Sequence, residues 1–295
     1  MDPAPLQNWN LNHSKKDDRM NRMIKLALTA CCIVAVLTLF VVFHSREVAH
    51  KPGPDMALKM LKDGNQRFVK EKTIHPNIGS ERLKLAGKSE QKDYAYATVI
   101  TCSDSRVPVE LIFDAGVMDI FVVRVAGNVC DVDEIGSIEY GLAHVHTPVL
   151  VVLGHTRCGA VTAVTHALSG KGHALERNIV PLVDNISPAV SRAMAMNPDI
   201  TGDDIIPYAI EENVWQGIED LFMNSPATRE IVKKGIAKVV GAIYDVSTGE
   251  IDWLPESNVL DILKKVEGNP GRAIEDETSG HHPAQGGESG KTKHQ

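Results

Sequence analysis

Aromatic residues are scarce in this chain of 295 residues, where phenylalanine, tyrosine and tryptophan together make up 5%. So small a share argues against a large stacking surface for single-stranded nucleic acid. An excess of basic residues is also missing, because 31 lysines and arginines stand against 38 acidic residues and give a formal net charge of -7. A mildly acidic chain without a basic stripe is a poor nucleic-acid binder, and we expect no nucleic-acid partner. The five cysteines are too few and too scattered for a disulfide scaffold.

The rest of the composition is that of an ordinary folded protein, with 43% hydrophobic and 23% charged residues. These shares exclude a wholly disordered, collagen-like or polytopic membrane protein. The length suits one large domain or two small ones.

A single long hydrophobic run lies near the N-terminus, where residues 26–43 contain no charge. A run of about 17–25 apolar residues can span a bilayer. Lysines and arginines precede it, and such cations stay on the cytoplasmic side. We therefore expect residues 1–22 in the cytoplasm and residues 23–45 as a transmembrane anchor or signal peptide. The chain after residue 45 would then lie in the periplasm, anchored to the inner membrane or exported.

Other interpretations of this N-terminal run stay open. A cleaved signal peptide is one, although Phe43-His44-Ser45 makes a poor cleavage site. Cys31 closes a segment that looks like a lipoprotein cleavage box, but the apolar run continues past it. An inverted anchor would leave the remaining chain in the cytoplasm.

Beyond a Pro-Gly linker, apolar strands alternate with helices from residue 51 to residue 267. The β-favouring runs are Ala97 to Thr101, Ile120 to Val125, Val149 to Leu153 and Ile236 to Tyr244. Their alternation with helices predicts an α/β domain with a mostly parallel sheet flanked by helices. A turn before Ile251 predicts an antiparallel edge hairpin, and the polar composition of residues 268–295 predicts a disordered tail.

Helical patterns occupy Glu134 to His146, Leu182 to Met196 and Ile205 to Met223. An earlier helix, around Ala57 to Phe68, has an apolar face without an obvious place in the sheet. We therefore expect this face to pack on a second copy of the chain.

Two polar segments come directly after the first and third predicted strands. One is Thr101-Cys-Ser-Asp-Ser-Arg-Val, and the other is Leu153-Gly-His-Thr-Arg-Cys-Gly-Ala-Val. The carboxyl ends of parallel strands share one edge of a sheet, where ligands collect. Two thiolates and an imidazole, from Cys102, His155 and Cys158, form a zinc-binding set that leaves a fourth position open. The helix after Cys158 would also favour its thiolate.

Taken singly, each of these residues has a plainer interpretation. A cysteine is most often a small buried apolar residue, and a lone histidine beside a strand is most often hydrogen-bonded in the core. A redox pair is a further alternative, although a Cys-x-x-Cys motif is absent. The occurrence of all three together, with Asp104 and Arg106 beside the first cysteine, favours the metal site.

The chain resembles the β-class carbonic anhydrases in several motifs. They are Cys102-Ser-Asp-Ser-Arg106, Gly154-His-Thr-Arg-Cys-Gly159, Arg124-Val-Ala-Gly-Asn128, Ile138-Glu-Tyr140 and, more loosely, Gly64-Asn-Gln-Arg-Phe68. The later Gly241-Ala-Ile-Tyr-Asp segment is similar to the family's closing strand pair. The resemblance covers roughly residues 55 to 265.

The resemblance implies a zinc enzyme that interconverts carbon dioxide and bicarbonate. Cys102, His155 and Cys158 would be zinc ligands. Asp104 would accept a hydrogen bond from zinc-bound hydroxide or, in a closed form, be the fourth ligand, and Arg106 would hold it away from the metal. The family also implies a homodimer or homotetramer with active sites near the subunit interface.

An apolar substrate pocket is implied as well. The resemblance assigns it Phe121, Val125, Tyr140 and the Gly159 amide, although Phe121 and Val125 are equally compatible with core packing. Cys130 matches no ligand position, and we expect it to be buried.

The sequence also departs from the family. Many members have a glutamine nine residues before the first zinc cysteine, where this chain has Asp93. Some bacterial members have a tryptophan three residues before it, as part of an inhibitory bicarbonate site, and here Val99 stands there.

Two alternative functions remain open. A hydrolase of carbon disulfide or carbonyl sulfide would keep the same metal set. A non-catalytic zinc- or bicarbonate-binding module would not need the Asp104 and Arg106 pair.

Overall fold

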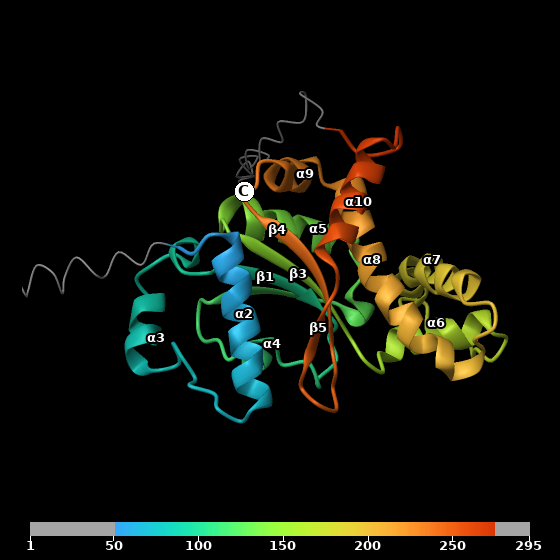
Figure 1. Ribbon diagram of the computed structural model, residues 1–295, viewed down its shortest axis with the longest axis horizontal. Helices are drawn as coiled ribbons and strands as arrows, with labels where there is room; N and C mark the ends of the chain where they lie inside the picture. The colour runs from blue at the N-terminus through green and yellow to red at the C-terminus, as the bar shows by residue number, and fades with distance from the viewer. Residues whose placement is uncertain (1–50, 275–295) are drawn as a thin grey trace, which may run out of the picture. The chain divides into compact units, whose positions relative to one another are not determined.

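The computed structural model describes residues 51–274, and its centre is a five-stranded sheet in the order β2-β1-β3-β4-β5 (Figure 1). The strands are β1 (Ala97–Thr101), β2 (Ile120–Arg124), β3 (Val149–His155), β4 (Lys238–Tyr244) and β5 (Ile251–Trp253). The first four strands run parallel to their neighbours, and β5 is antiparallel to β4. The predicted fold class is confirmed, including the edge hairpin.

The strand bounds differ from the prediction by only a few residues. β3 continues to His155, two residues past the predicted end, and all of it is buried. β4 begins at Lys238 rather than Ile236. Gly235 makes a turn there with a φ of 66°, and Ile236 is exposed.

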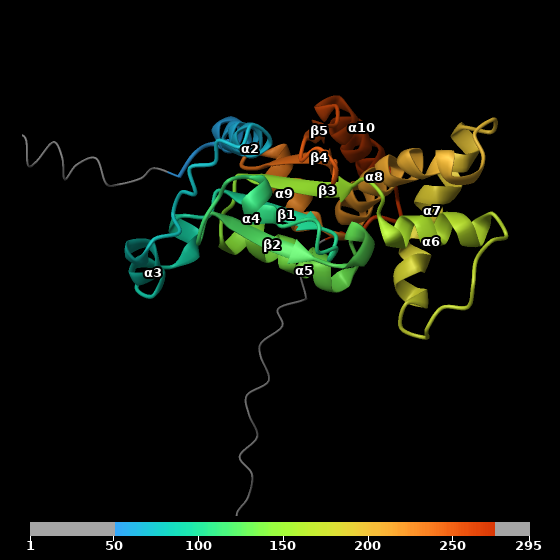
Figure 2. The same cartoon turned by 90° about the horizontal axis from the view of Figure 1, so that it is seen from below.

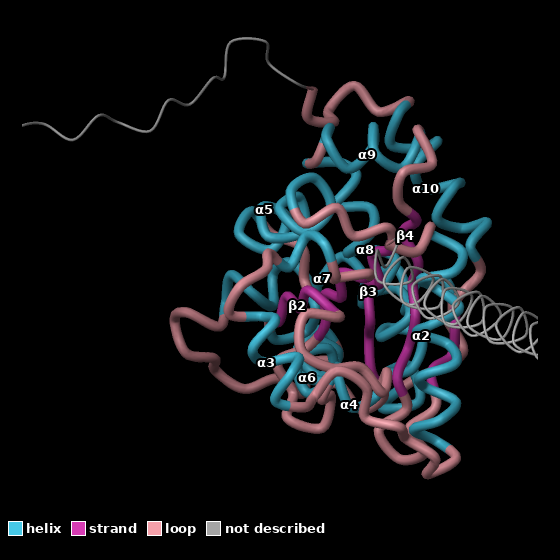
Figure 3. The backbone as a smooth tube through the Cα atoms, turned by 90° about the vertical axis from the view of Figure 1, so that its left-hand side faces the viewer, coloured by secondary structure: helices cyan, strands magenta, loops and turns pink. Residues whose placement is uncertain are grey.

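Helices connect the strands. They are α2 (Pro54–Val69), α3 (Ser80–Ala86), α4 (Val109–Ile112), α5 (Val132–Glu139), α6 (Gly159–Leu168), α7 (Val180–Met196), α8 (Ile206–Asn224), α9 (Pro226–Lys233) and α10 (Glu256–Glu267). A capping box between Asp131 and Glu134 starts α5. The turn after α5, Tyr140–His144, is π-helical. Figure 3 shows the helices surrounding the strands.

Both faces of the sheet are covered, because successive strand residues alternate between two hydrophobic clusters. Ile100 and Val152 point into a cluster with α5, α8 and α10. Val99 and Val151 point into the other, with α2 and α4. This two-sided burial explains why the strands appear as continuous apolar runs in the sequence.

The expectation for the first helix is wrong. Ala57, Leu58 and Leu61 of α2 are buried in the cluster that also contains Val99 and Val151. The apolar face of α2 therefore lies on the sheet of its own chain. The sequence pattern showed an apolar face but not where it packs.

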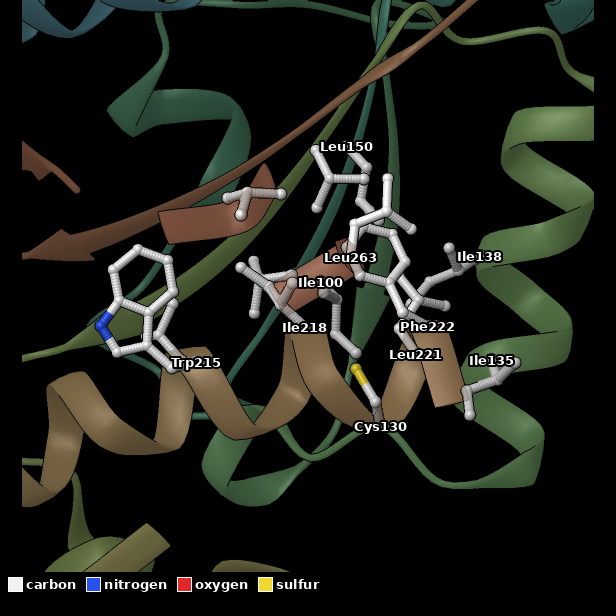
Figure 4. Close-up of a cluster of buried hydrophobic side chains, with 14 of the residues drawn as sticks. Ile100, Cys130, Ile135, Ile138, Leu150, Trp215, Ile218, Leu221, Phe222 and Leu263 are labelled. Atoms are coloured by element: carbon white, nitrogen blue, oxygen red, sulfur yellow. The ribbon is translucent and has the colours of Figure 1, made fainter. Parts of the chain in front are cut away.

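Cys130 lies in the cluster formed by α5, α8 and α10, beside Ile135, Leu221 and Phe222 (Figure 4). Its side chain is a free, buried thiol, as expected. Burial raises the pKa of this thiol well above its usual value. Cys130 is therefore a packing residue.

A third cluster lies where α6 and α7 sit together beyond one end of the sheet (Figures 1 and 2). It combines Cys102 and Cys158 with Val161, Ile186 and Val190. The two cysteines of the predicted metal set are therefore in one apolar surrounding.

The predicted tail begins too early. After α10 ends at Glu267, the backbone amide of Ala273 donates to Met223, and the Arg229 side chain donates to the Ala273 carbonyl. These bonds hold residues 268–273 against the ends of α8 and α9. The remainder of the predicted tail, residues 275–295, lies outside the described residues.

The predicted anchor, residues 23–45, also lies outside the described residues. Within residues 51–274, no helix combines the length and the apolar character needed to cross a membrane.

Candidate metal centre

Two neighbouring strands deliver the predicted ligands to one edge of the sheet. β1 and β3 pair in parallel, with Thr101 opposite Leu153. Cys102 follows β1 directly, and His155 is the last residue of β3. Cys158 stands just before α6. The parallel register therefore places the two conspicuous sequence segments side by side, as predicted.

The structure brings Cys102, His155 and Cys158 together. Each offers one ligand atom, and these atoms all lie within 4.8 Å of one another. All three side chains are buried, and His155 has 0% exposure. Three potential donors thus converge in a site closed to bulk solvent.

The tautomer of His155 follows from its hydrogen bond. Nδ1 lies 3.0 Å from the carbonyl oxygen of Thr156. A carbonyl only accepts, so Nδ1 must carry the proton and Nε2 must present its lone pair. Among residues 51–274, that buried Nε2 has no hydrogen-bond partner. A histidine that binds a metal needs one ring nitrogen with a free lone pair, and Nε2 of His155 provides it beside two sulfurs.

The pKa values of the two thiols are shifted in opposite directions. A hydrogen bond from Cys158 is the largest cause that lowers the pKa of Cys102, and the Gly127 amide lowers it further. The same contact raises the pKa of Cys158, because its proton is held between the two sulfurs. The amides of Ala160 and Val161, in the first turn of α6, oppose that rise.

This donor set fits zinc. Two thiolates and one imidazole are a usual zinc environment, and three protein ligands leave one position for a reactant. The hydrogen bond from Nδ1 to a backbone carbonyl is the support that a ligating histidine typically receives.

Asp104 lies beside this group and is bound by Arg106. Nε and Nη2 of Arg106 donate to the two carboxylate oxygens over 2.9 and 2.6 Å, and the Arg106 backbone amide adds a third bond. Arg106 holds the pKa of Asp104 far below its usual range. The Oδ2 atom of Asp104 remains 4.0 Å from Nε2 of His155. Asp104 is thus an ionised carboxylate directed toward the ligand group.

Arg106 and Arg124 tie the loops of the site together. Arg124 donates to the carbonyls of Cys102 and Asp104 over 3.2 and 2.7 Å. Arg106 donates to the Arg157 carbonyl over 3.1 Å. Arg124 had no role predicted from the sequence, although it lies in one of the quoted motifs. Its role depends on two carbonyls whose positions are visible only in the folded chain.

A cavity of about 1180 Å³ adjoins the site and is lined by both Arg106 and Gly159. Its wall also includes polar residues such as Thr162, His166 and Asp203. Apolar residues such as Ile206, Ile210 and Ile243 complete its lining. Val125, from the implied pocket, packs instead on the cluster that contains Cys102 and Cys158.

Phe121 and Tyr140 lie elsewhere. Phe121 pairs with Thr98, three residues before the end of β1, which places it about 10 Å back along the strand. Its ring centroid is 6.0 Å from that of Tyr140, which is 51% exposed. Neither residue lines the cavity beside Arg106. Within one chain, these two aromatic residues are therefore separate from the ligand group.

Comparison with known proteins agrees with this geometry. The family model described as carbonic anhydrase matches residues 97–251. The carbonic anhydrase of Mycolicibacterium smegmatis is 34% identical over 199 residues, which cover 68% of this chain and 92% of that protein. Carbonic anhydrase 2 of Mycobacterium tuberculosis is 34% identical over 197 residues, covering 66% of this chain and 90% of that protein.

A solved structure is also similar. The β-carbonic anhydrase CafA of Aspergillus fumigatus has a TM-score of 0.54 and 25% identity, covering 72% of this chain and 97% of that one. The residues that the family model matches include both segments that form the ligand group. The similar solved structure is a β-carbonic anhydrase. The chain therefore belongs to the carbonic anhydrase family, in its β-class.

Proposed function

We propose that this protein catalyses the reversible hydration of carbon dioxide to bicarbonate and a proton, with zinc held by Cys102, His155 and Cys158. The observation that carries the proposal is the unpartnered Nε2 of His155, buried within 4.8 Å of two cysteine sulfurs. The reaction is inferred from the carbonic anhydrase family, to which the chain belongs. Zinc bound there supplies hydroxide near neutral pH, because it lowers the pKa of water from about 15.7 to about 7.

The residues of the chain then orient this nucleophile. Asp104 is ionised, and its Oδ2 atom faces the ligand group with an acceptor position left after Arg106 binds. It can therefore accept a hydrogen bond from the nucleophile and fix its direction. Arg106 grips both carboxylate oxygens, which keeps Asp104 from binding the metal. The Gly159 amide begins α6 and is placed to stabilise negative charge on the product.

Hydrolysis of carbon disulfide or carbonyl sulfide is the competing activity, since it would use the same ligands. Zinc quantitation combined with stopped-flow assays on residues 51–295 distinguishes the two. We expect bound zinc and faster turnover of carbon dioxide than of either sulfur compound. Faster turnover of the sulfur compounds would reverse the assignment. Bound zinc without hydration between pH 6 and pH 9 would indicate a binding module instead.

We also propose a homodimer or a larger homo-oligomer. β2 is an edge strand of the described sheet and carries the half-buried Phe121 beside the exposed Tyr140. These side chains do not line the site of their own chain, so they can serve as pocket residues only in a second copy. Light scattering on residues 51–295 is expected to show a dimer or larger. A fully active monomer would contradict the proposal.

The proposed location is outside the cytoplasm, with an N-terminal membrane anchor or an exported form. Five cations precede the apolar run, whereas only Arg46 and Lys51 follow within the next ten residues. Disulfides form in such a compartment. Coordination to zinc would keep Cys102 and Cys158 as bound thiolates there and so protect them from oxidation.

A further inference from the structure

Gly127 connects the loop after β2 to the metal centre. Its backbone amide donates to the Cys102 sulfur over 3.3 Å, and this contact is buried. The bond exists because Gly127 has a φ of 75°, a conformation that glycine adopts readily. An N–H bond to a thiolate stabilises its charge, so the position of this one peptide affects how Cys102 binds a metal.

Asn213, from a distant part of the chain, holds the next peptide group, which joins Gly127 to Asn128. It lies in the middle of α8, and its Nδ2 donates to the Gly127 carbonyl over 2.7 Å. The two residues are 86 positions apart, and Asn213 is 2% exposed. Val214 and Ile218, the neighbours of Asn213 on α8, are buried against the sheet, so the helix is a rigid support.

We infer that Asn213 is a positioning residue for the zinc ligand Cys102, which rests on the metal site of the proposed function. Asn213 holds the carbonyl of the Gly127–Asn128 peptide. This restrains the Cα of Gly127, which joins that peptide to the preceding one, whose amide donates to the sulfur. Without the Asn213 donor, a buried carbonyl loses its partner. The Gly127–Asn128 peptide keeps the bond from the Asn128 amide to the Val125 carbonyl but is less restrained on its other side, so Gly127 can shift relative to the sulfur. The Cys102 sulfur then loses its N–H bond and becomes easier to detach from the metal.

A substitution of Gly127 itself would be a poor test of whether Asn213 positions Cys102. A Cβ at Gly127 would lie 2.6 Å from Cδ1 of Ile186, and the positive φ adds strain. A substitution there would disturb the loop for reasons unrelated to Cys102. Asn213→Leu removes the donor while keeping a side chain of similar size. Asn213→Ala also removes the donor, and its smaller side chain cannot clash with its neighbours.

The chain contains a matched control in Asn65. It is also buried, at 6% exposure, and its Nδ2 donates over 2.8 Å to the carbonyl of Gly249, another glycine with a positive φ of 81°. Asn65 lies on α2, and its bonds join it to Ile112, Gly249 and Ile251 rather than to the ligand group. Asn65→Leu therefore reproduces the general cost of losing such a bond.

The experiment uses the purified full chain loaded with cobalt or zinc. We expect the sulfur-to-cobalt charge-transfer band of Asn213→Leu and Asn213→Ala to move to longer wavelength. We also expect zinc transfer to a chelator to be about 10-fold faster than in the wild type. Asn65→Leu should match the wild type in both measurements, whatever its stability.

The outcomes separate this inference from the proposed function. If the wild type takes up metal and both Asn213 variants match Asn65→Leu in band position and release rate, the inference is overturned. A wild type that binds cobalt but hydrates no carbon dioxide overturns only the proposed function. A wild type that binds no cobalt overturns the metal site and, with it, both proposals.

Discussion

Individual residues in this protein are made reactive by their backbone partners. The Thr156 carbonyl fixes the His155 proton on Nδ1 and so leaves Nε2 available. After the hydrogen bond from Cys158, the Gly127 amide lowers the pKa of Cys102, and the amides in the first turn of α6 oppose the rise in the pKa of Cys158. Because a substitution does not remove a backbone carbonyl or amide, substitutions at the ligands themselves are the most direct test.

Replacing any one ligand should remove the metal. Cys102→Ser, His155→Ala and Cys158→Ser each leave two protein ligands, and we expect zinc affinity to fall by more than about 100-fold. Zinc analysis of the purified variants checks this, and hydration activity should disappear with the metal. Cys130→Ser is the control, since its thiol lies in the apolar cluster. A variant with full zinc occupancy would show that its residue is not a ligand.

The Asp104 and Arg106 pair should affect activity without affecting metal content. Asp104→Asn and Arg106→Ala are expected to retain zinc and lose about 100-fold in kcat/KM, because the nucleophile is no longer oriented. Arg106→Lys keeps the positive charge but cannot make both parallel bonds to the carboxylate, so its activity should be intermediate. Normal turnover in Arg106→Ala, measured by stopped flow, would exclude the orienting role.

At the level of elements, α8 links the core to the metal centre. Its residues Ile218 and Phe222 pack in the sheet cluster, while Asn213 reaches the Gly127 carbonyl. The same helix carries Asp220, whose Oδ1 accepts a bond from Gln216 over 2.6 Å. Burial raises the pKa of Asp220 to about 6 from its usual 3.8.

This raised pKa predicts a pH-dependent stability. A carboxyl whose pKa is higher in the folded state favours folding most below pH 3.8, and this contribution is lost as the pH rises through 6. The difference between a pKa of 3.8 and a pKa of about 6 corresponds to about 3 kcal/mol in the free energy of unfolding. Asp220→Asn removes the buried charge and keeps the acceptor for Gln216. We expect it to unfold at higher urea concentration than the wild type at pH 8, with a smaller advantage at pH 5.

Asp261 provides the comparison for this measurement, because it is exposed on α10. The urea midpoint of Asp261→Asn should differ from that of the wild type by the same small amount at both pH values. An Asp220→Asn advantage that did not grow between pH 5 and pH 8 would show that burial does not control the ionisation of Asp220.

On the scale of the whole molecule, the proposed topology can be tested in cells. If the domain lies outside the cytoplasm, protease added to intact bacterial spheroplasts should digest it. A cytoplasmic marker protein in the same sample should survive until the cells are lysed. Protection of the domain before lysis, with digestion afterwards, would place the enzyme in the cytoplasm and indicate an inverted anchor.

The sequence by itself determined the order of the strands and which residues meet at the edge of the sheet. β1 was predicted with the bounds that the structure has, because a strand buried on both faces is a continuous apolar run. Cys102, His155 and Cys158 were predicted from their chemistry and from their positions directly after strands. In a parallel sheet, such positions meet at one edge whatever the helices do.

Only the tertiary structure decided how helices and loops meet around that frame. It placed α2 on the sheet of its own chain, Phe121 and Tyr140 away from the ligand group, and Asn213 on the Gly127 carbonyl. Asparagine in the middle of α8 has no local signal, since its partner is 86 residues away. Such contacts depend on where whole helices pack, and the periodicity of one segment shows which face is apolar but not what that face will contact.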